Sequence, residues 1–245
     1  MPTGRRLNGS WASRPAIPPR RRQWVSPERN AFGKSTSDST RTIYQLLSGP
    51  KLQPADVIQP SRIKGLDVII SNKSLIDFPL AVAAETAPER KLEQKFNGFH
   101  GYDYLIFDSP PSLGLTTINI MLAAGEIIIP VALTYFALDG CSEIMETIGS
   151  VSESFGRPDL RVSMVVPTLY RNTRLANEIM QKLKEHFGNR LAKTVIRYNV
   201  RIDEAQSHGL TIWEYDPHSA GAEMLRELSQ EVLKDARKGS RQRPV

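Results

Sequence analysis

The residues with the clearest chemical potential lie around one carboxylate, Asp108. It directly follows a short apolar run, Tyr104–Phe107, and it precedes a rigid Pro110-Pro111 turn. Nucleotide-binding α/β sheets place a metal-facing carboxylate at the carboxyl end of a buried strand. Many ordinary core strands also end in Asp at a turn. The pattern therefore indicates an edge of a metal–nucleotide site only if other parts of the chain support it.

The residues that would bind phosphate are not found in the sequence. A phosphate loop needs glycines whose backbone N–H groups cradle the phosphates, a Lys for charge and a Ser or Thr for Mg²⁺. The nearest approach is Gly33–Thr36, but Glu28 stands at the first glycine position of the G-x-x-x-x-G-K-[ST] pattern. Three arginines at positions 20–22 stand where an apolar strand should lead into such a loop. We therefore expect no working phosphate loop in this chain.

The elements that must position these residues alternate from about residue 40. Continuously apolar strands are expected at Leu66–Ile70, Tyr104–Phe107, Glu126–Val131, Arg161–Val166 and Lys193–Ile196. Helices are expected at Thr40–Leu47, Leu75–Phe96 (with breaks near Pro79 and Pro88), Leu115–Ala124, Asp139–Phe155, Leu175–Phe187 and Ser219–Lys234. Apolar strands that alternate with helices predict an α/β fold, a mostly parallel sheet with helices on both faces.

The first 34 residues differ from the rest in charge. They hold eight Arg or Lys and one acid, a net +7, whereas the whole chain carries +6 and the remainder therefore −1. Five of the 17 prolines also lie there. Such a segment buries too little apolar surface to offset its ordering entropy, so we expect disorder over residues 1–37. It is either a basic arm for nucleic acid or a product of a wrong start site or reading frame.

The body of the chain is expected to form one α/β domain over residues 38–237, followed by a frayed tail at 238–245. A hydrophobic content of 40% and a charged content of 24% are typical of a soluble globular protein. No apolar run is long enough to span a membrane, and the amino terminus lacks the apolar core of a signal peptide. The single cysteine, Cys141, excludes an internal disulfide and is expected to be a buried apolar side chain.

Six ordered motifs resemble the ParA/Soj-type partition ATPases, members of the MinD/ParA P-loop family. They are Arg41–Ser71 (with DVIQP and GLDVI), Tyr102–Ala124 (the Walker B strand, its Pro-Pro turn and its helix), Thr134–Gly140 (TYFALDG), Tyr170–Leu175 (YRNTRL), Lys193–Gly209 and Tyr215–Ala222 (YDPHSAGA). The resemblance covers most of the chain. It implies a protein that partitions chromosomes or plasmids and that is, by class, an ATP hydrolase. Such proteins would form homodimers that bind non-specific DNA. They would act in the cytoplasm, at the nucleoid, and not at a membrane. A ParB-like, centromere-binding partner would stimulate hydrolysis.

The resemblance also implies roles for particular residues. Asp108 would lie beside Mg²⁺, through water, as the catalytic-site carboxylate. Pro110 and Pro111 would belong to the switch that senses the γ-phosphate of ATP, and Asn199 would lie near the adenine. The arginines that would contact DNA phosphates are Arg171, Arg174 and Arg201. Such contacts are independent of sequence and sensitive to salt.

The chain departs from the family pattern where the chemistry is concentrated. The family's KGGxGKT loop and the first strand that leads into it are missing, which leaves enzymatic activity open. Ser26 stands where the family has an Asp that helps to align water and metal, and Arg197 and Gln206 stand where prolines are usual. Loss of an interior parallel strand leaves rows of backbone N–H and C=O groups without partners, so the fold should be unstable or should recruit a substitute.

Three interpretations follow from the sequence. The chain is a partition ATPase with an incomplete amino terminus, an ATP-independent DNA-binding or regulatory relative that keeps the fold, or a division-site positioning ATPase. The third interpretation lacks a basic amphipathic helix for a membrane surface. Dehydrogenases and Ser-His-Asp hydrolases are excluded, because the sequence contains neither G-x-G-x-x-G nor G-x-S-x-G.

Overall fold

The computed structural model describes residues 21–26 and 41–241, with backbone alone for 21–26 and 237–241. The other residues of the predicted 1–37 segment and the end of the predicted tail lie outside the described residues. Within the described ranges, no helix combines the length and the apolar content that a bilayer span requires.

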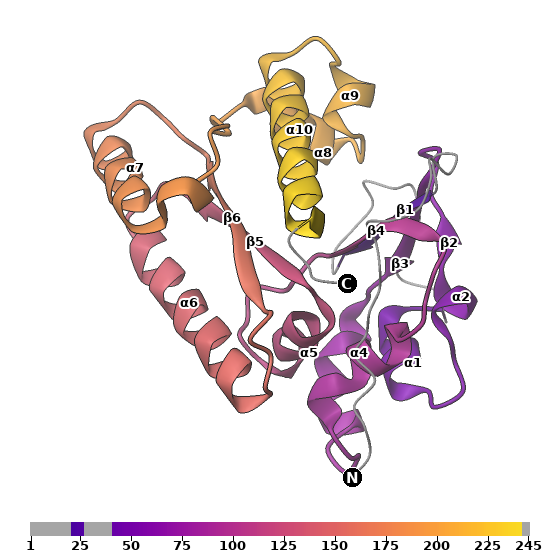
Figure 1. The fold of residues 1–245 in the computed structure, drawn as a ribbon. Helices are drawn as coiled ribbons and strands as arrows, with labels where there is room; N and C mark the ends of the chain where they lie inside the picture. Colours follow the sequence, from indigo (N-terminus) through magenta and orange to yellow (C-terminus); the bar gives the residue numbers. More distant parts are fainter. Residues whose placement is uncertain (1–20, 27–40, 242–245) are drawn as a thin grey trace.

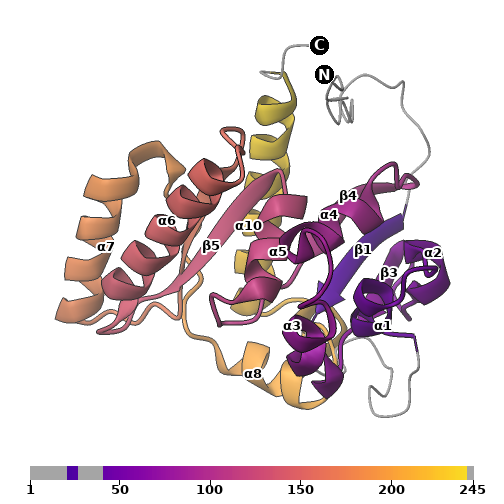
Figure 2. The same cartoon turned by 90° about the horizontal axis from the view of Figure 1, so that it is seen from below.

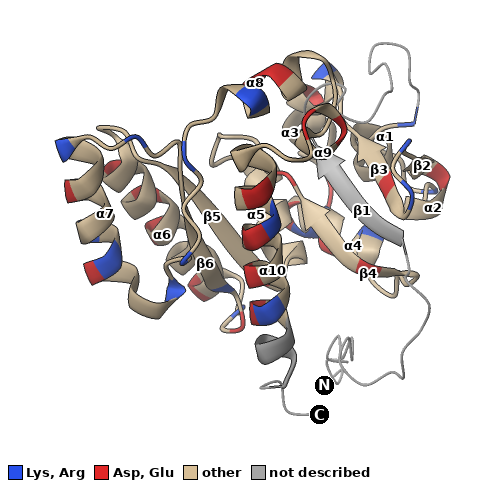
Figure 3. Cartoon of the chain, turned by 90° about the horizontal axis from the view of Figure 1, so that it is seen from above, with Lys and Arg blue, Asp and Glu red and all other residues tan. Residues whose placement is uncertain are grey.

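The first sheet contains the strand that ends at Asp108. Its strands are β1 (Arg21–Ser26), β2 (Gln59–Pro60), β3 (Leu66–Ile70) and β4 (Tyr102–Phe107), in the order β2-β3-β1-β4. β1 runs parallel to both neighbours, and β2 pairs antiparallel with β3. The second sheet has two parallel strands, β5 (Glu126–Ala132) and β6 (Arg161–Thr168). Figure 1 and Figure 3 show the two sheets side by side.

The strand β1 corrects one expectation. We expected no strand before Gly33, yet Arg21–Ser26 occupy an interior position between β3 and β4. The reason is that a parallel ladder is made of backbone groups, so a polar segment that contains Trp24 and Val25 can supply it when both neighbours offer partners. The prediction of disorder throughout 1–37 is therefore wrong at these six residues.

The predicted mostly parallel strands are present, and in the described residues they form two groups. In the described residues β4 pairs only with β1, and β5 pairs only with β6. The expected strand Lys193–Ile196 is replaced by an extended segment with isolated bridges from Val165 to Leu191 and from Tyr170 to Arg197. The two sides of this pairing differ in length between the bridges, so a regular ladder cannot form.

The helices follow the predicted order. They are α1 (Ile43–Ser48), α2 (Pro54–Val57), η1 (Lys73–Asp77), α3 (Phe78–Ala81), η2 (Pro88–Arg90), α4 (Lys91–Phe96), α5 (Leu115–Ala123), α6 (Ala137–Ser154), α7 (Arg174–Phe187), η3 (Gly188–Arg190), α8 (Val200–Ser207), α9 (Ile212–Tyr215) and α10 (Ala220–Arg241). The predicted breaks in Leu75–Phe96 are confirmed, because Pro79 lies in the short α3 and Pro88 begins η2.

Helix α5 joins two hydrophobic cores. Met121 and Leu122 belong to the core that β5 and β6 share with α6 and α7. Leu115 and Ile120 pack against the core formed by α1, β3, α3 and α4. Figure 2 shows α5 between the β5 side and the β1 side of the molecule. A helix that is apolar all round requires burial on several sides, and α5 obtains it from both halves of the fold.

Helix α10 covers the opposite face of the second sheet. Its residues Met224, Leu225, Leu228 and Val232 pack against Met164 and Val166 of β6. β5 and β6 are therefore sandwiched between α10 on one face and α5, α6 and α7 on the other (Figure 1). Cys141 of α6 is buried, as predicted, and burial raises the pKa of its thiol.

Candidate functional site

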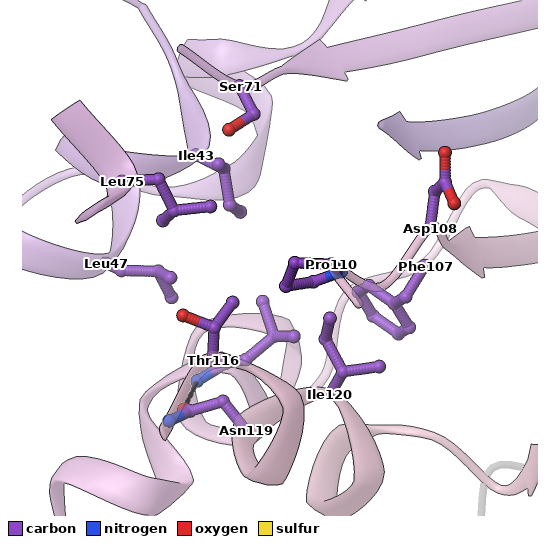
Figure 4. A pocket seen from close by; sticks show the side chains of 11 residues that line it. Ile43, Leu47, Ser71, Leu75, Phe107, Asp108, Pro110, Thr116, Asn119 and Ile120 are labelled. Carbon is purple, nitrogen blue, oxygen red and sulfur yellow. Dashed lines mark hydrogen bonds between the residues drawn. The ribbon is translucent and has the colours of Figure 1, made fainter. Parts of the chain in front are cut away.

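The carboxyl ends of three parallel strands meet beside Asp108. Ser26 of β1 is the Cα partner of Ile70 on β3, and Val25 is the partner of Phe107 on β4. Ser26 and Asp108 are thus at the same level on adjacent strands. Asp108 is exposed, and its carboxylate points away from the apolar side chains below it (Figure 4).

The loop after Asp108 is tied to the first turns of α5 by hydroxyl groups. Thr117 is buried, and its Oγ1 donates to the carbonyl of Ser112 at 2.5 Å and lies 3.2 Å from Oγ of Ser109. Helix α5 begins after Gly114 without a side-chain cap. The threonine therefore fixes the loop that carries Pro110 and Pro111, and with it the position at which Asp108 leaves the sheet.

An apolar hollow of about 410 Å³, open to solvent, lies next to this loop. Its walls come from α1, η1, α4, β4, α5 and the segment after β3. Pro110 lies among the lining side chains, and Asp108 lies at the edge of the hollow (Figure 4). Pro111 is exposed and does not line it. The lining residues are Ile43, Leu47, Ser71, Leu75, Leu92, Phe107, Asp108, Pro110, Thr116, Asn119 and Ile120. No basic side chain is among them, so this wall does not suit a polyphosphate.

Asn199, the predicted adenine contact, is the N-cap of α8. Its Oδ1 accepts a hydrogen bond from the backbone N–H of Arg201 at 2.9 Å. The same side chain packs closely against Gly221 at the start of α10. The contacts that the structure gives Asn199 are thus structural, between α8 and α10. It does not line the hollow beside Asp108 and Pro110.

Arg171 belongs to a cluster that the sequence did not reveal, here called the Tyr–Arg cluster and made of Tyr170, Arg171, Arg197 and Tyr198. Cζ of Arg171 lies 4.0 Å from the ring centroid of Tyr198, and Cζ of Arg197 lies 5.9 Å from that of Tyr170. The backbone joins the pairs, because the N–H of Tyr198 donates to the carbonyl of Tyr170 at 3.0 Å. The signal available in the sequence was the pair of Tyr/Arg dipeptides.

Arg174 and Arg201, the other predicted DNA contacts, are exposed and already paired with acids. Arg174 begins α7 and contacts Glu178 at 2.8 Å. Arg201 contacts Glu204 at 2.9 Å, which raises the pKa of Arg201 and lowers that of Glu204. Figure 3 shows both signs of charge along α7 and α8. The structure therefore brings Arg171 into the Tyr–Arg cluster and leaves Arg174 and Arg201 in local ion pairs.

A further ion pair holds α9 against the segment between β2 and β3. The guanidinium of Arg62 donates to both carboxylate oxygens of Glu214, at 2.9 and 3.0 Å, and to the carbonyl of Gly209 at 2.7 Å. This hydrogen bonding lowers the pKa of Glu214 to about 2. Glu214 also closes the capping box of α9 with Thr211.

The described residues fit only part of a Mg²⁺–ATP site. Asp108 supplies a carboxylate at the carboxyl end of a parallel strand, where such sheets bind metal and nucleotide. In the described ranges, however, no group of three His, Cys, Asp or Glu side chains comes together, at Asp108 or elsewhere. Described glycines with left-handed backbone, such as Gly65 and Gly101, lie before the amino ends of β3 and β4, not at the edge that carries Asp108. The donor set for phosphate therefore does not fit.

Comparison with known proteins gives consistent relatives. A family model described as an AAA domain matches residues 27–162. The sporulation initiation inhibitor protein Soj of Bacillus subtilis (strain 168) is 32% identical over 212 residues, which cover 85% of this chain and 83% of that protein. The chromosome-partitioning ATPase Soj of Thermus thermophilus is 33% identical over 211 residues, with 85% and 81% covered.

A solved structure confirms the fold. Cobyrinic acid a,c-diamide synthase of Mycobacterium smegmatis, with a bound ATP analogue and magnesium, matches with a TM-score of 0.76 and 21% identity. The match covers 90% of this chain and 84% of that one. The α/β fold of the P-loop type that the sequence predicted is thereby confirmed.

Proposed function

Because the chain belongs to the ParA/Soj family of partition ATPases, we propose that it acts in the partitioning of chromosomes or plasmids. The observation that carries the proposal is 32% identity to a Soj protein over 85% of the chain. The relatives are matched over most of their own length as well, so the similarity is not confined to a nucleotide-binding core. An ATP-independent relative is the less favoured alternative, since a matched protein is named as an ATPase.

The proposed DNA surface is centred on the Tyr–Arg cluster, with Arg174 and Arg201 beside it in sequence. Arg171 keeps its charge and offers N–H donors while its planar face stacks on Tyr198. Stacking holds the guanidinium in place, so less side-chain entropy is lost when a phosphate binds. Arg174 and Arg201 must exchange a carboxylate for a phosphate, which makes their contributions smaller.

Nucleotide and Mg²⁺ belong to the function at the level of the family, and solved relatives of this fold contain both. On this chain we propose that Asp108 lies beside Mg²⁺ and that Pro110 and Pro111 form the switch that senses the γ-phosphate. We propose Asn199 as the residue near the adenine. Because the described residues supply no phosphate cradle, we derive no hydrolysis step from them.

The proposed setting is the cytoplasm, at the nucleoid, as a homodimer that meets a ParB-like DNA-bound partner. This assignment rests on the family and on the exposed basic side chains at the Tyr–Arg cluster. A partner can stimulate ATP hydrolysis only if the nucleotide site is complete. We therefore expect stimulation only where phosphate donors are supplied in addition to the described residues.

The function is tested by deleting the gene and measuring how often daughter cells lose the chromosome or plasmid that carries it. The deletion strain is expected to lose the chromosome or plasmid more often than the wild type, and the wild-type gene should restore normal inheritance. Normal inheritance of every replicon in the deletion strain would overturn the proposal. The variant Arg171→Ala tests whether the role depends on DNA binding. If it does, this variant should fail to restore inheritance in the deletion strain.

A further inference from the structure

Three segments lie side by side at the carboxyl ends of β5 and β6, and each exposes large apolar side chains. They are residues 133–136, 168–171 and 196–200. The N–H of Leu133 donates to the carbonyl of Thr168 at 3.1 Å, which joins the first segment to the second. The N–H of Tyr170 donates to the carbonyl of Ile196, also at 3.1 Å, which joins the second to the third. The three segments therefore form one continuous surface.

The first segment carries two aromatic rings that the fold leaves largely uncovered. Tyr135 is 74% exposed and Phe136 is 72% exposed. Their ring centroids lie 5.0 Å apart with the ring planes at 88°, and neither ring is part of the hydrophobic cores of the described residues. Neighbouring aromatic rings that stay in contact with water indicate a binding surface.

The middle segment adds a strained apolar residue. Leu169 has left-handed backbone, with a φ of 52°, and is 50% exposed. A side chain with a Cβ adopts this conformation at a cost in backbone energy, and such strain is concentrated at functional sites. Leu169 separates Thr168, which ends β6 beside the aromatic pair, from Tyr170 of the Tyr–Arg cluster. The aromatic pair and the cluster are thus joined by a residue that the fold holds in an unfavourable conformation.

The charge of this surface is entirely positive. The three segments contain two cations, Arg171 and Arg197, and no acid. Exposed rings interleaved with arginines suit a ligand that combines a polyanionic backbone with flat, apolar groups. A double helix offers the phosphates, but its bases are stacked inside it and do not reach an exposed ring. A single strand offers both the phosphates and the faces of its bases.

We infer that this surface binds single-stranded DNA, with unpaired bases stacked on Tyr135 and Phe136 and with phosphates bound by the Tyr–Arg cluster. A base and an exposed ring each lose unfavourable contact with water when they stack. Arg171 lies over Tyr198 and keeps N–H groups for a phosphate. Because DNA is taken from the proposed partitioning role, the binding of unpaired bases rests on that role and adds to it the state of the strand.

The test measures the affinity of the full chain for three fluorescent probes by anisotropy at one salt concentration. The probes are a strand of about 20 thymidines, a strand of equal charge with abasic sites in place of the bases, and a duplex of equal length. The thymidine strand is expected to bind about tenfold more tightly than the abasic strand. Both strands carry the same phosphates, so the difference in affinity measures the contribution of the bases.

Variants assign that contribution to the aromatic pair. Tyr135→Ala and Phe136→Ala are each expected to weaken binding of the thymidine strand by about tenfold and to leave binding of the abasic strand and the duplex unchanged. Both side chains are largely exposed, so the melting temperature of each variant should match that of the wild type. Trp213→Ala is the matched control, because Trp213 is 42% exposed on α9, outside the three segments, and should leave all three affinities unchanged.

Four results would overturn the inference. The first is equal affinity for the thymidine strand and the abasic strand. The second is an equal loss of affinity for all three probes in Phe136→Ala. The third is tighter binding of a uridine strand, which would assign the surface to RNA. The fourth is self-association of the free chain that Phe136→Ala abolishes while binding of the thymidine strand is unchanged, which would assign the rings to a second copy of this chain.

These failures are distinguishable from a failure of the partitioning role. That role is judged by inheritance in the deletion strain, which none of the four results measures. Normal inheritance together with base-dependent binding of the thymidine strand would overturn the partitioning role alone.

Discussion

The guanidinium of Arg171 lies over the ring of Tyr198, with 4.0 Å between Cζ and the ring centroid. The two residues come from different segments, the loop before α7 and the loop before α8, and the backbone bonds around Tyr170 hold the segments together. An exposed cation fixed on an aromatic face is suited to bind a phosphate with little further ordering.

Arg171→Ala is expected to weaken binding to DNA of any sequence and to lower the slope of log K against log [salt] by about one. The measurement is a salt titration of DNA affinity by fluorescence anisotropy. Arg190→Ala is the matched control, since Arg190 also lies over a ring, that of Phe187, but at the other end of α7. Equal effects of the two variants would show that DNA binding follows net charge alone.

Glu214→Gln is expected to lower stability at neutral pH by at most about 1 kcal/mol, because the pair with Arg62 is about one-third exposed and solvent screens it. The folded-state pKa of Glu214, about 2, lies below its ordinary value of 4.5. The stabilisation is therefore present above about pH 4.5 and is lost as the pH falls toward 2. Thermal unfolding of both proteins across this range checks it: the difference in melting temperature should shrink on acidification.

Asn119→Ala is expected to destabilise the chain by about 2–3 kcal/mol, since it leaves buried backbone groups without partners. The Asn119 side chain accepts from the N–H of Leu92 and donates to the carbonyls of Pro88 and Leu115. It thereby fixes α4 against α5. The free energy of unfolding in urea measures the change. Asn97→Ala, at an exposed position after α4, should change stability by less than about 0.5 kcal/mol.

Two glycines in helices should respond to alanine with opposite signs. At Gly221 an added Cβ would lie 2.8 Å from Cγ1 of Ile202 and 3.1 Å from Oδ1 of Asn199, so Gly221→Ala should cost about 1–3 kcal/mol. At Gly149, within α6, no atom lies within 4 Å of such a Cβ, so Gly149→Ala should stabilise by about 0.5–1 kcal/mol. Denaturation midpoints would show the contrast, and a stabilising Gly221→Ala would contradict the close packing of α8 on α10.

The sequence predicted most elements because their apolar runs and their prolines act locally. The run before Asp108, the breaks at Pro79 and Pro88 and the helix after Gly114 all follow from residues close in sequence. The strand β1 was missed, because its backbone partners on β3 and β4 are far away in the sequence and its own composition is polar. Pairing across a sheet overrides local preference.

The candidate site was predicted only in part, for the same reason. Asp108 could be placed from its neighbours, whereas the stacking of Arg171 on Tyr198 depends on how the segment after α7 returns along β6. Asn199 was expected at a base, but its position directly before a helix is typical of an N-cap, and the structure shows that cap. Its predicted role toward the base stays a prediction.

The purified chain is expected to bind ATP negligibly, with or without Mg²⁺. A carboxylate at the end of β4 cannot hold a polyphosphate without donors for its charge, and the hollow beside Asp108 is lined by apolar side chains. Isothermal titration of the full chain with ATP and Mg²⁺ is the measurement, and Asp108→Ala should behave like the wild type because there is no binding to lose. A micromolar, Mg²⁺-dependent affinity that Asp108→Ala weakens would contradict this prediction. It would mean that residues outside the described ranges supply the phosphate donors beside Asp108.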